Sequence, residues 1–234
     1  MRDIYTRVFG RLGAHELSIL LAFLGLAAGV WVFAAIADEV SEGDAQKIDA
    51  RILLSFRHPG DLSPIGTPGI QDAVRDVTAL GGVTVLTLLT AIAAGFLFLE
   101  GRKHMAAFVV ASVLGGFLIS ILLKDFFQRP RPDLVPHGAY VSNTSFPSGH
   151  SMLSAITYLT LGALLARSER RKSLKAYWML LAGFITFAVG VSRVYLGVHW
   201  PTDVLAGWTA GATWALVCWL LARRLQTRQA IEAE

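Results

Sequence analysis

Eight residues in the second half of the chain could do chemistry together, and they fall into three short blocks. They are Lys124, Arg131, Ser148, Gly149, His150, Arg193, His199 and Asp203. Three cations suit a phosphate ester, whose oxygens carry negative charge that must be stabilised in the transition state. Serine and glycine at a helix start add backbone N–H groups and the positive end of the helix dipole. This set predicts phosphoryl transfer, with cations in the place that a metal would take.

Two histidines divide the remaining steps. A neutral imidazole can attack phosphorus and form a phosphohistidine, provided that a partner fixes its tautomer and stabilises the developing cation. Asp203 follows His199 by four residues, within one helical turn, which favours His199 as the nucleophile. His150 is then the acid that protonates the leaving oxygen and later the base for water. The reverse assignment is also physically possible.

Each residue also has an ordinary structural interpretation. Lys124 suits an interfacial lysine whose stem lies along apolar surface, and Ser148 suits a helix N-cap. Asp203 follows Pro201 by two positions, where an acid favours the helix dipole. Arg193 fits such an interpretation least well, because it ends a long apolar run. The gathering of all these groups at one membrane boundary favours a shared function.

The composition indicates a membrane protein. Of 234 residues, 54% are hydrophobic and 16% are charged, whereas soluble domains have about 25% charged residues. A helix that crosses the bilayer core needs about 20 apolar residues. Six candidate spans meet this need: Leu17–Ala37, Val77–Leu99, Met105–Leu123, Ser148–Ala166, Ala176–Val191 and Val204–Ala222. We therefore predict an all-α fold, a bundle of six transmembrane helices.

The basic residues predict the orientation of this bundle. Thirteen of the 21 Lys and Arg residues lie in the two tails and in the linkers after the second and fourth spans. Cytoplasmic segments are enriched in these residues, so both termini should be cytoplasmic. The three blocks then lie at the outer membrane boundary. This predicts a multi-pass protein of the cell (inner) membrane with its active site facing the periplasm or exterior.

The chain is expected to form one domain, residues 1–234. Its parts are a tail and first span (1–37), an outward linker (38–76), a catalytic region of five spans (77–222) and a cytoplasmic tail (223–234). The first span also resembles a cleavable signal peptide, because it ends in Ala35-Ile36-Ala37. Its apolar run exceeds the roughly 7–15 residues of a signal core, which favours a retained helix.

The outward linker contains a further helical pattern. Within Ala45–Arg57, apolar side chains recur at helical spacing, with Lys47, Asp49 and Arg51 between them. Such a segment suits a helix in the plane of the membrane interface, or a short helix packed on the bundle.

Two pairs of glycines are spaced four apart inside the spans, Gly25 with Gly29 and Gly207 with Gly211. This spacing allows close helix contact in lipid. We expect it to serve packing within one subunit, and it leaves the oligomeric state open.

The three blocks resemble the signature of a known family. Lys124-x6-Arg131-Pro132, Pro147-Ser148-Gly149-His150 and Ser192-Arg193-x5-His199-x3-Asp203 are similar to the signature of the type 2 phosphatidic acid phosphatase superfamily, without a departure at any signature position. The blocks cover about a third of the chain.

This resemblance implies a lipid phosphatase that needs no metal. It assigns phosphate binding to Lys124, Arg131, Ser148, Gly149 and Arg193, nucleophilic attack to His199, its partner to Asp203 and acid/base work to His150. The implied substrates are phosphatidic acid, phosphatidylglycerophosphate or polyprenyl diphosphates at the outer leaflet. No cofactor is expected, since the sequence has no Cys/His or carboxylate cluster with metal-ligand spacing, and its one cysteine, Cys218, is too few for a structural zinc site. The expected partners are the lipid substrate and the bilayer, not nucleic acid.

The sequence leaves alternatives open. The same phosphohistidine could pass its phosphoryl group to a lipid acceptor, which would make the protein a phosphotransferase. The superfamily also resembles vanadium haloperoxidases, but these are soluble. A transporter would be expected to place charges at mid-span. Tyr140, Asn143 and Trp200 are candidates for shaping headgroup preference by position alone.

Overall fold

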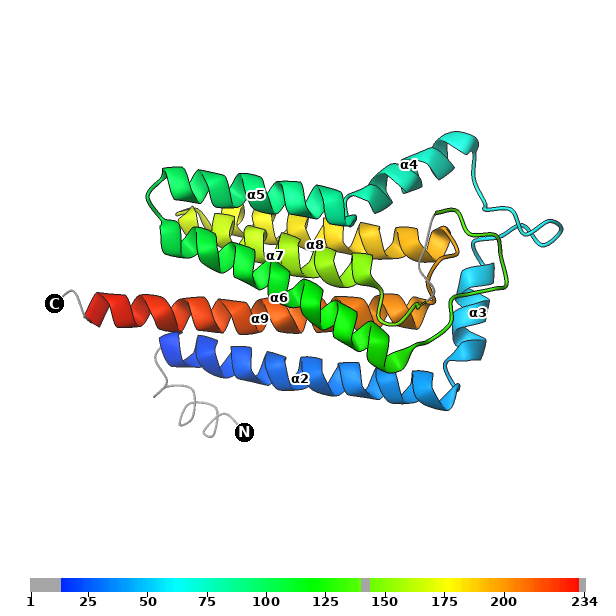
Figure 1. Cartoon of the computed structure of the whole chain (residues 1–234), viewed down its shortest axis with the longest axis horizontal. Helices are drawn as coiled ribbons and strands as arrows, with labels where there is room; N and C mark the ends of the chain where they lie inside the picture. The colour runs from blue at the N-terminus through cyan, green and yellow to red at the C-terminus, as the bar shows by residue number, and fades with distance from the viewer. Residues whose placement is uncertain (1–13, 140–143, 232–234) are drawn as a thin grey trace.

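The computed structural model describes residues 14–139 and 144–231, and the regular elements in these ranges are helices (Figure 1). In chain order they are α2 (Ala14–Glu42), α3 (Gln46–Leu54), α4 (Pro68–Ala79), α5 (Val83–Leu99), α6 (Lys103–Phe127), α7 (Gly149–Ser168), α8 (Lys172–Tyr195) and α9 (Pro201–Ile231). Helices α2, α6, α7, α8 and α9 are each long and apolar enough to cross a membrane, and α4 with α5 supplies a sixth span. The predicted all-α bundle is confirmed.

The second span is broken, which the prediction of one run over Val77–Leu99 missed. Helix α4 ends at Ala79, α5 begins at Val83, and the pair is bent by 49°. A Cβ at Gly81 in the break would lie 2.4 Å from Val189 Cγ1 of α8, so only glycine allows this approach. Helix α4 therefore leans away from α5 at one end of the bundle (Figure 1).

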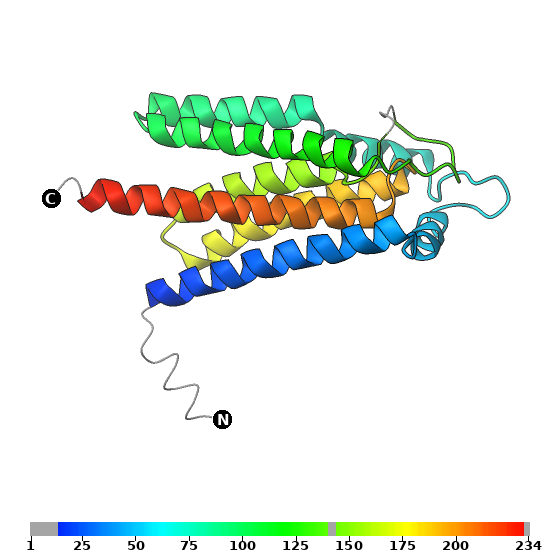
Figure 2. The ribbon, with the colours of Figure 1, turned by 60° about the horizontal axis from the view of Figure 1, so that its bottom comes forward.

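Helix α7 lies at the centre of the bundle. Eight consecutive residues, Ser151–Tyr158, are all buried, and α7 packs against α8 and α9 along its length. Figures 1 and 2 show the long helices running side by side around it. A helix that is buried on all sides needs small or apolar residues around its whole circumference. The first turn of α7 is thereby held rigidly at the end of the bundle.

Both glycine pairs pack within the chain, as predicted. The first pair lies against α9, where a Cβ at Gly29 would be 2.1 Å from Thr213 Oγ1. The second pair lies against α7, where a Cβ at Gly211 would be 2.5 Å from the Met152 carbonyl oxygen. Close contact of α7 with α9 brings their first turns together, and these turns carry His150 and Asp203.

The linker helix is present as α3, and it packs on the bundle. It lies across the end of the bundle, against α9 (Figure 1). On the face of α3 that points to the bundle, Asp49 and Leu53 are fully buried. On the opposite face, Ile48 and Ile52 are 60% and 42% exposed. The inner face of α3 agrees with the alternative of a short helix packed on the bundle. The exposed apolar side chains of its outer face suit contact with lipid at the membrane interface.

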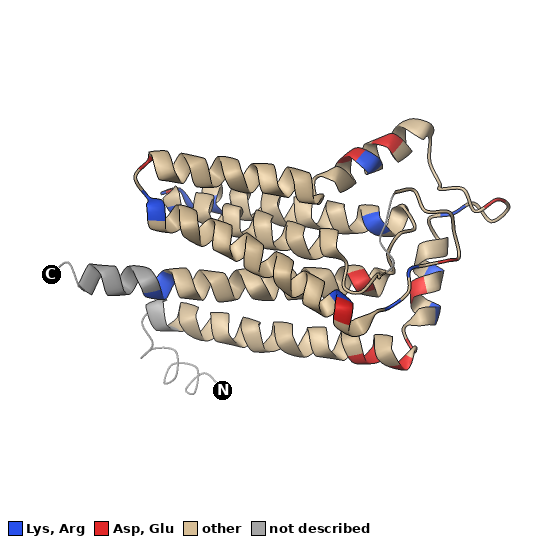
Figure 3. Cartoon of the chain, viewed as in Figure 1, with Lys and Arg blue, Asp and Glu red and all other residues tan. Residues whose placement is uncertain are grey.

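Charged residues gather at the two ends of the bundle (Figure 3). The first turn of α2 and the last turns of α9 lie at the same end, and α3 and α4 lie at the other (Figure 1). The described parts of the chain thus form one bundle whose α3 end carries the ends of α6 and α8 and the starts of α7 and α9.

Candidate active site

All eight predicted residues lie at the α3 end of the bundle. Lys124 and Arg193 are in the last turns of α6 and α8, and Arg131 follows α6. Ser148, Gly149 and His150 form the start of α7. His199 precedes α9, whose first turn contains Asp203. The four helix ends that hold them are far apart in sequence and meet because the helices are antiparallel neighbours.

His199 is held in a buried turn between α8 and α9. Gly197 in this turn has a φ of +72°, and a Cβ there would lie 2.5 Å from Val135 Cγ2. Glycine tolerates both conditions. His199 Nδ1 lies 3.3 Å from Asp203 Oδ2, and its Nε2 lies 3.1 Å from Arg131 Nη1. The imidazole therefore stands between a carboxylate and a guanidinium.

These two neighbours define the tautomer of His199. A guanidinium can only donate hydrogen bonds, so Nε2 accepts from Arg131 and carries no proton. The proton then sits on Nδ1 and points to Asp203. Burial, and then the positive charges of Arg131, Arg193 and Lys124, hold the pKa of His199 well below its ordinary value of 6.5. The result is a neutral imidazole with the lone pair of Nε2 directed at a cation.

The other two cations come from the last turns of α6 and α8. Lys124 Nζ donates to the Thr144 carbonyl at 3.3 Å, and its Cε would lie 3.5 Å from a Cβ at Gly149. Arg193 is 3% exposed, and its Nη1 donates to Thr78 Oγ1 at 3.0 Å. Its Nε has no hydrogen-bond partner among the described residues. An anion bound here would satisfy that buried donor.

The start of α7 adds backbone donors to the same place. Ser148 is the N-cap, and its Oγ accepts from Ser151 Oγ at 3.0 Å and from Ser151 N at 3.5 Å. Its own N–H donates to the Asp203 carbonyl at 2.9 Å, which joins the starts of α7 and α9. The first N–H groups of a helix have no carbonyl one turn earlier. The arrangement presents them, with the helix dipole, beside Lys124.

His150 lies against the α4–α5 break. A Cβ at Gly82 would be 4.0 Å from His150 Nε2, and one at Gly81 would be 3.3 Å from His150 Cβ. A positive charge on His150 would lower the pKa of His199. The glycines of the break and Thr78 were missed as parts of this site, although the Gly81-Gly82 pair inside an apolar run was a visible signal.

Two further residues, Asp49 and Arg129, complete the arrangement and were also missed as site residues. Arg129 Nη1 donates to Asp203 Oδ1 at 2.7 Å, and its Nη2 donates to Asp49 Oδ2 at 2.8 Å. Asp49 Oδ1 accepts the backbone N–H of Thr202 at 2.9 Å. One guanidinium thus joins two buried carboxylates, and α3 caps the start of α9.

Replacing Asp49 with alanine should lower the free energy of unfolding by about 2–4 kcal/mol, because the part-buried Thr202 N–H and one side of the Arg129 guanidinium lose their acceptor, while Arg129 keeps Asp203 as a partner. The measurement is unfolding of the purified protein in detergent. Asp44, an exposed acid just before α3, is the matched control, and its alanine variant should stay within about 0.5 kcal/mol of the parent. Equal stabilities of the two variants would mean that the Asp49 contacts contribute nothing.

Of the three residues expected to shape headgroup preference, Trp200 lies among the described residues, and it is buried. Trp200 is 5% exposed, and its Nε1 donates to the Pro130 carbonyl at 3.2 Å. The guanidinium of Arg129 lies 5.5 Å from its ring centre. Trp200 therefore supports Arg129 from inside the protein, where it cannot meet a headgroup directly. Tyr140 and Asn143 lie outside the described residues.

Comparisons with known proteins point to one family. The family model described as the PAP2 superfamily matches residues 104–226, which include all three blocks. Phosphatidylglycerophosphatase B of Bacillus subtilis (strain 168) is 36% identical over 154 residues, 63% of this chain and 72% of that one. An undecaprenyl-diphosphatase of Sulfolobus acidocaldarius is 36% identical over 116 residues, 48% of this chain and 50% of that one.

A solved structure agrees with these matches. The crystal structure of a transmembrane PAP2 type phosphatidylglycerolphosphate phosphatase from Bacillus subtilis has a TM-score of 0.72 and 26% identity to this chain. The likeness covers 85% of this chain and 96% of that one, so it extends to helices outside the three blocks. The family model alone spans more than half of the sequence. The chain belongs to the PAP2 superfamily.

Proposed function

We propose that this protein hydrolyses a lipid phosphate or diphosphate without a metal, through a phosphohistidine on His199. The main support is the row of contacts from Asp203 through His199 to Arg131. It leaves Nε2 unprotonated and beside a phosphate-binding cation, so a phosphate that takes over the Arg131 hydrogen bond meets the free lone pair that attack on phosphorus requires. The names of the relatives support lipid phosphates and diphosphates as the substrate class.

The reaction has two displacements. His199 Nε2 forms a bond to phosphorus as the bond from phosphorus to the lipid oxygen breaks, and His150 gives its proton to that oxygen. Asp203 stabilises the positive imidazole that forms. Water then attacks the phosphohistidine and gives a proton to His150, and the phosphorus–nitrogen bond breaks to release phosphate and restore His199.

The three cations stabilise the phosphoryl oxygens in both steps. Arg131 and Arg193 offer paired N–H donors that match phosphate oxygens, and Lys124 adds a point charge over the start of α7. Preorganised charge of this kind lowers the barrier more than any other single effect in many enzymes. The nearby carboxylates of Asp49 and Asp203 are both bound to Arg129, so the local field favours an anion over a divalent cation.

The placement in the membrane is part of the same proposal. The end of the bundle opposite the site carries the basic linkers, the start of α2 and the end of α9, which supports cytoplasmic termini. The site then faces the periplasm or exterior, at the boundary where a lipid headgroup emerges from the bilayer. Helix α2 packs on α9 through its glycines, which supports a retained first span and a single domain.

Purified protein in liposomes should release phosphate from at least one of four lipids. The panel is phosphatidic acid, phosphatidylglycerophosphate, diacylglycerol diphosphate and undecaprenyl diphosphate. EDTA should leave the rate unchanged within about twofold, because the cations do the work of a metal. A metal-dependent phosphatase assayed in parallel shows that the chelator is effective. Loss of activity with EDTA would contradict the metal-free mechanism. Transfer of labelled phosphoryl groups to a second lipid would establish a transferase instead.

A further inference from the structure

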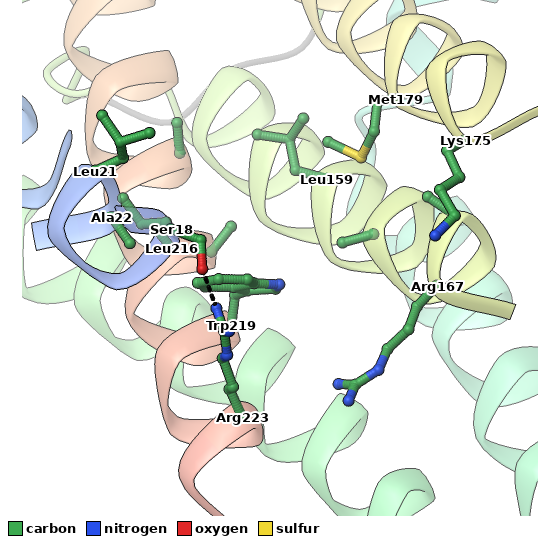
Figure 4. A pocket seen from close by; sticks show the side chains of 14 residues that line it. Ser18, Leu21, Ala22, Leu159, Arg167, Lys175, Met179, Leu216, Trp219 and Arg223 are labelled. Carbon is green, nitrogen blue, oxygen red and sulfur yellow. Dashed lines mark hydrogen bonds between the residues drawn. The ribbon is translucent and has the colours of Figure 1, made fainter. Parts of the chain in front are cut away.

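A cavity lies at the opposite end of the bundle from the histidines. Helices α2, α7, α8 and α9 surround it, and its volume is about 850 Å³ (Figure 4). Arg167, in the last turn of α7, is one of its lining residues. It lies about 25 Å along the helix from His150, at 1.5 Å per residue. The cavity is therefore separate from the candidate active site.

Most of the cavity wall is apolar and open to the outside of the bundle. Leu21 of α2 and Met179 of α8 line it and are 58% and 40% exposed. Leu159 and Ala163 of α7 line it from the interior side. Pockets of roughly 300–1,000 Å³ hold small organic ligands, so this one has room for a flexible chain. On a surface that faces the bilayer, an acyl chain is the apolar group at hand.

Three cations from three helices surround the same cavity. They are Arg167 of α7, Lys175 of α8 and Arg223 of α9 (Figure 4). The Arg223 guanidinium donates to Ser18 Oγ at 2.7 Å and lies 5.2 Å from the ring centre of Trp219, which holds it at the cavity. None of the described residues that line the cavity is acidic. The charge there is complementary to an anion.

We propose that this cavity binds an anionic glycerophospholipid of the leaflet opposite the active site. The headgroup phosphate lies among Arg167, Lys175 and Arg223, and one acyl chain lies along the apolar wall. Basic pockets between transmembrane helices bind acidic headgroups in this way. Inorganic phosphate would leave the apolar wall unused, and a lipid without net charge would complement the three cations less well. The bound lipid would connect α2, which packs mainly on α9, to α7 and α8.

The test measures binding of dioleoyl phosphatidylglycerol to the purified full chain in neutral detergent by native mass spectrometry. Dioleoyl phosphatidylcholine and inorganic phosphate are the comparison ligands. A double variant, R167Q with K175Q, removes two cations from the cavity. Its matched control, R170Q with R171Q, removes two charges from the linker between α7 and α8, and neither residue lines the cavity.

We expect phosphatidylglycerol to bind at least tenfold more tightly than phosphatidylcholine, and inorganic phosphate not to compete. The cavity variant should weaken phosphatidylglycerol binding about 30-fold, and the control by less than about twofold. Ala163→Phe should also weaken binding while all cations remain, because its ring occupies the part of the apolar wall along which the acyl chain lies. Equal binding of the two lipids, equal losses in the two charge variants, or undiminished binding by Ala163→Phe would each overturn the proposal.

Discussion

Replacing His199 with alanine is expected to lower kcat for phosphate release about 10⁴-fold or more. The variant loses the Nε2 lone pair that stands opposite Arg131, and no other imidazole at the site is paired with a carboxylate in the described contacts. His199 is nearly fully buried, so the folding of the variant must be checked by unfolding in detergent. Phosphate release from the preferred lipid of the four-lipid panel is the measurement.

His104→Ala is the control for this variant, because His104 is exposed at the opposite end of the bundle. It should retain the rate of the parent protein within about twofold. A folded His199→Ala protein that kept a tenth or more of the parent kcat would rule out His199 as the nucleophile. Loss of activity without loss of folding would separate the chemical role from a structural one.

Replacing Asp203 with asparagine is expected to lower kcat about 10³- to 10⁴-fold with little change in KM. Asparagine keeps an acceptor for the Trp200 N–H, which Asp203 Oδ2 accepts at 2.9 Å. It removes the negative charge that fixes the His199 tautomer and stabilises the imidazolium, a change that costs about 10⁴-fold in a comparable triad. Arg129 keeps Asp49 as its partner, so the fold should persist.

The check is a comparison of kcat and KM for Asp203→Asn with those of Asp125→Asn. Asp125 is an exposed acid beside Lys124 at the end of α6, and its amide variant should behave like the parent. A rise in KM with kcat unchanged would mean that Asp203 serves binding alone. Equal behaviour of the two variants would remove Asp203 from the mechanism.

The three blocks could be predicted from the sequence because each lies where an apolar run ends. Apolar runs of about 20 residues locate the membrane boundaries, and alternating direction of the spans brings Lys124, His150, Arg193 and His199 to one side. The N-cap at Ser148 was likewise visible, since a short polar residue before a helical run has a local preference for that position. These inferences need only local sequence and the bilayer thickness.

The link between Asp49 and Arg129 could not be predicted in the same way. Eighty residues separate the two, and an acid between apolar positions of a short helix usually faces solvent. Its burial depends on how α3 crosses the start of α9, which no local pattern specifies. Arg129 was visible only as a basic residue of the linker after the third span, two positions before Arg131.

The break in the second span was hidden by its hydropathy. Leu80-Gly81-Gly82 continues an apolar run, so the length of the run suggests one straight helix. The bend falls at a pair of glycines, and α8 and His150 come too close to Gly81 for any side chain there. Trp200 illustrates the opposite error, since a tryptophan at a predicted boundary is typical of the headgroup region but is buried under Arg129 here.

The stereochemical course at phosphorus tests the phosphohistidine route most directly. A substrate of the active lipid class, made chiral at its transferred phosphoryl group with oxygen isotopes and sulfur, is hydrolysed by the purified protein, and the configuration of the released thiophosphate is determined. Each in-line displacement inverts phosphorus, so attack by His199 followed by attack by water predicts net retention. Net inversion would show a single direct attack by water and would contradict the covalent intermediate.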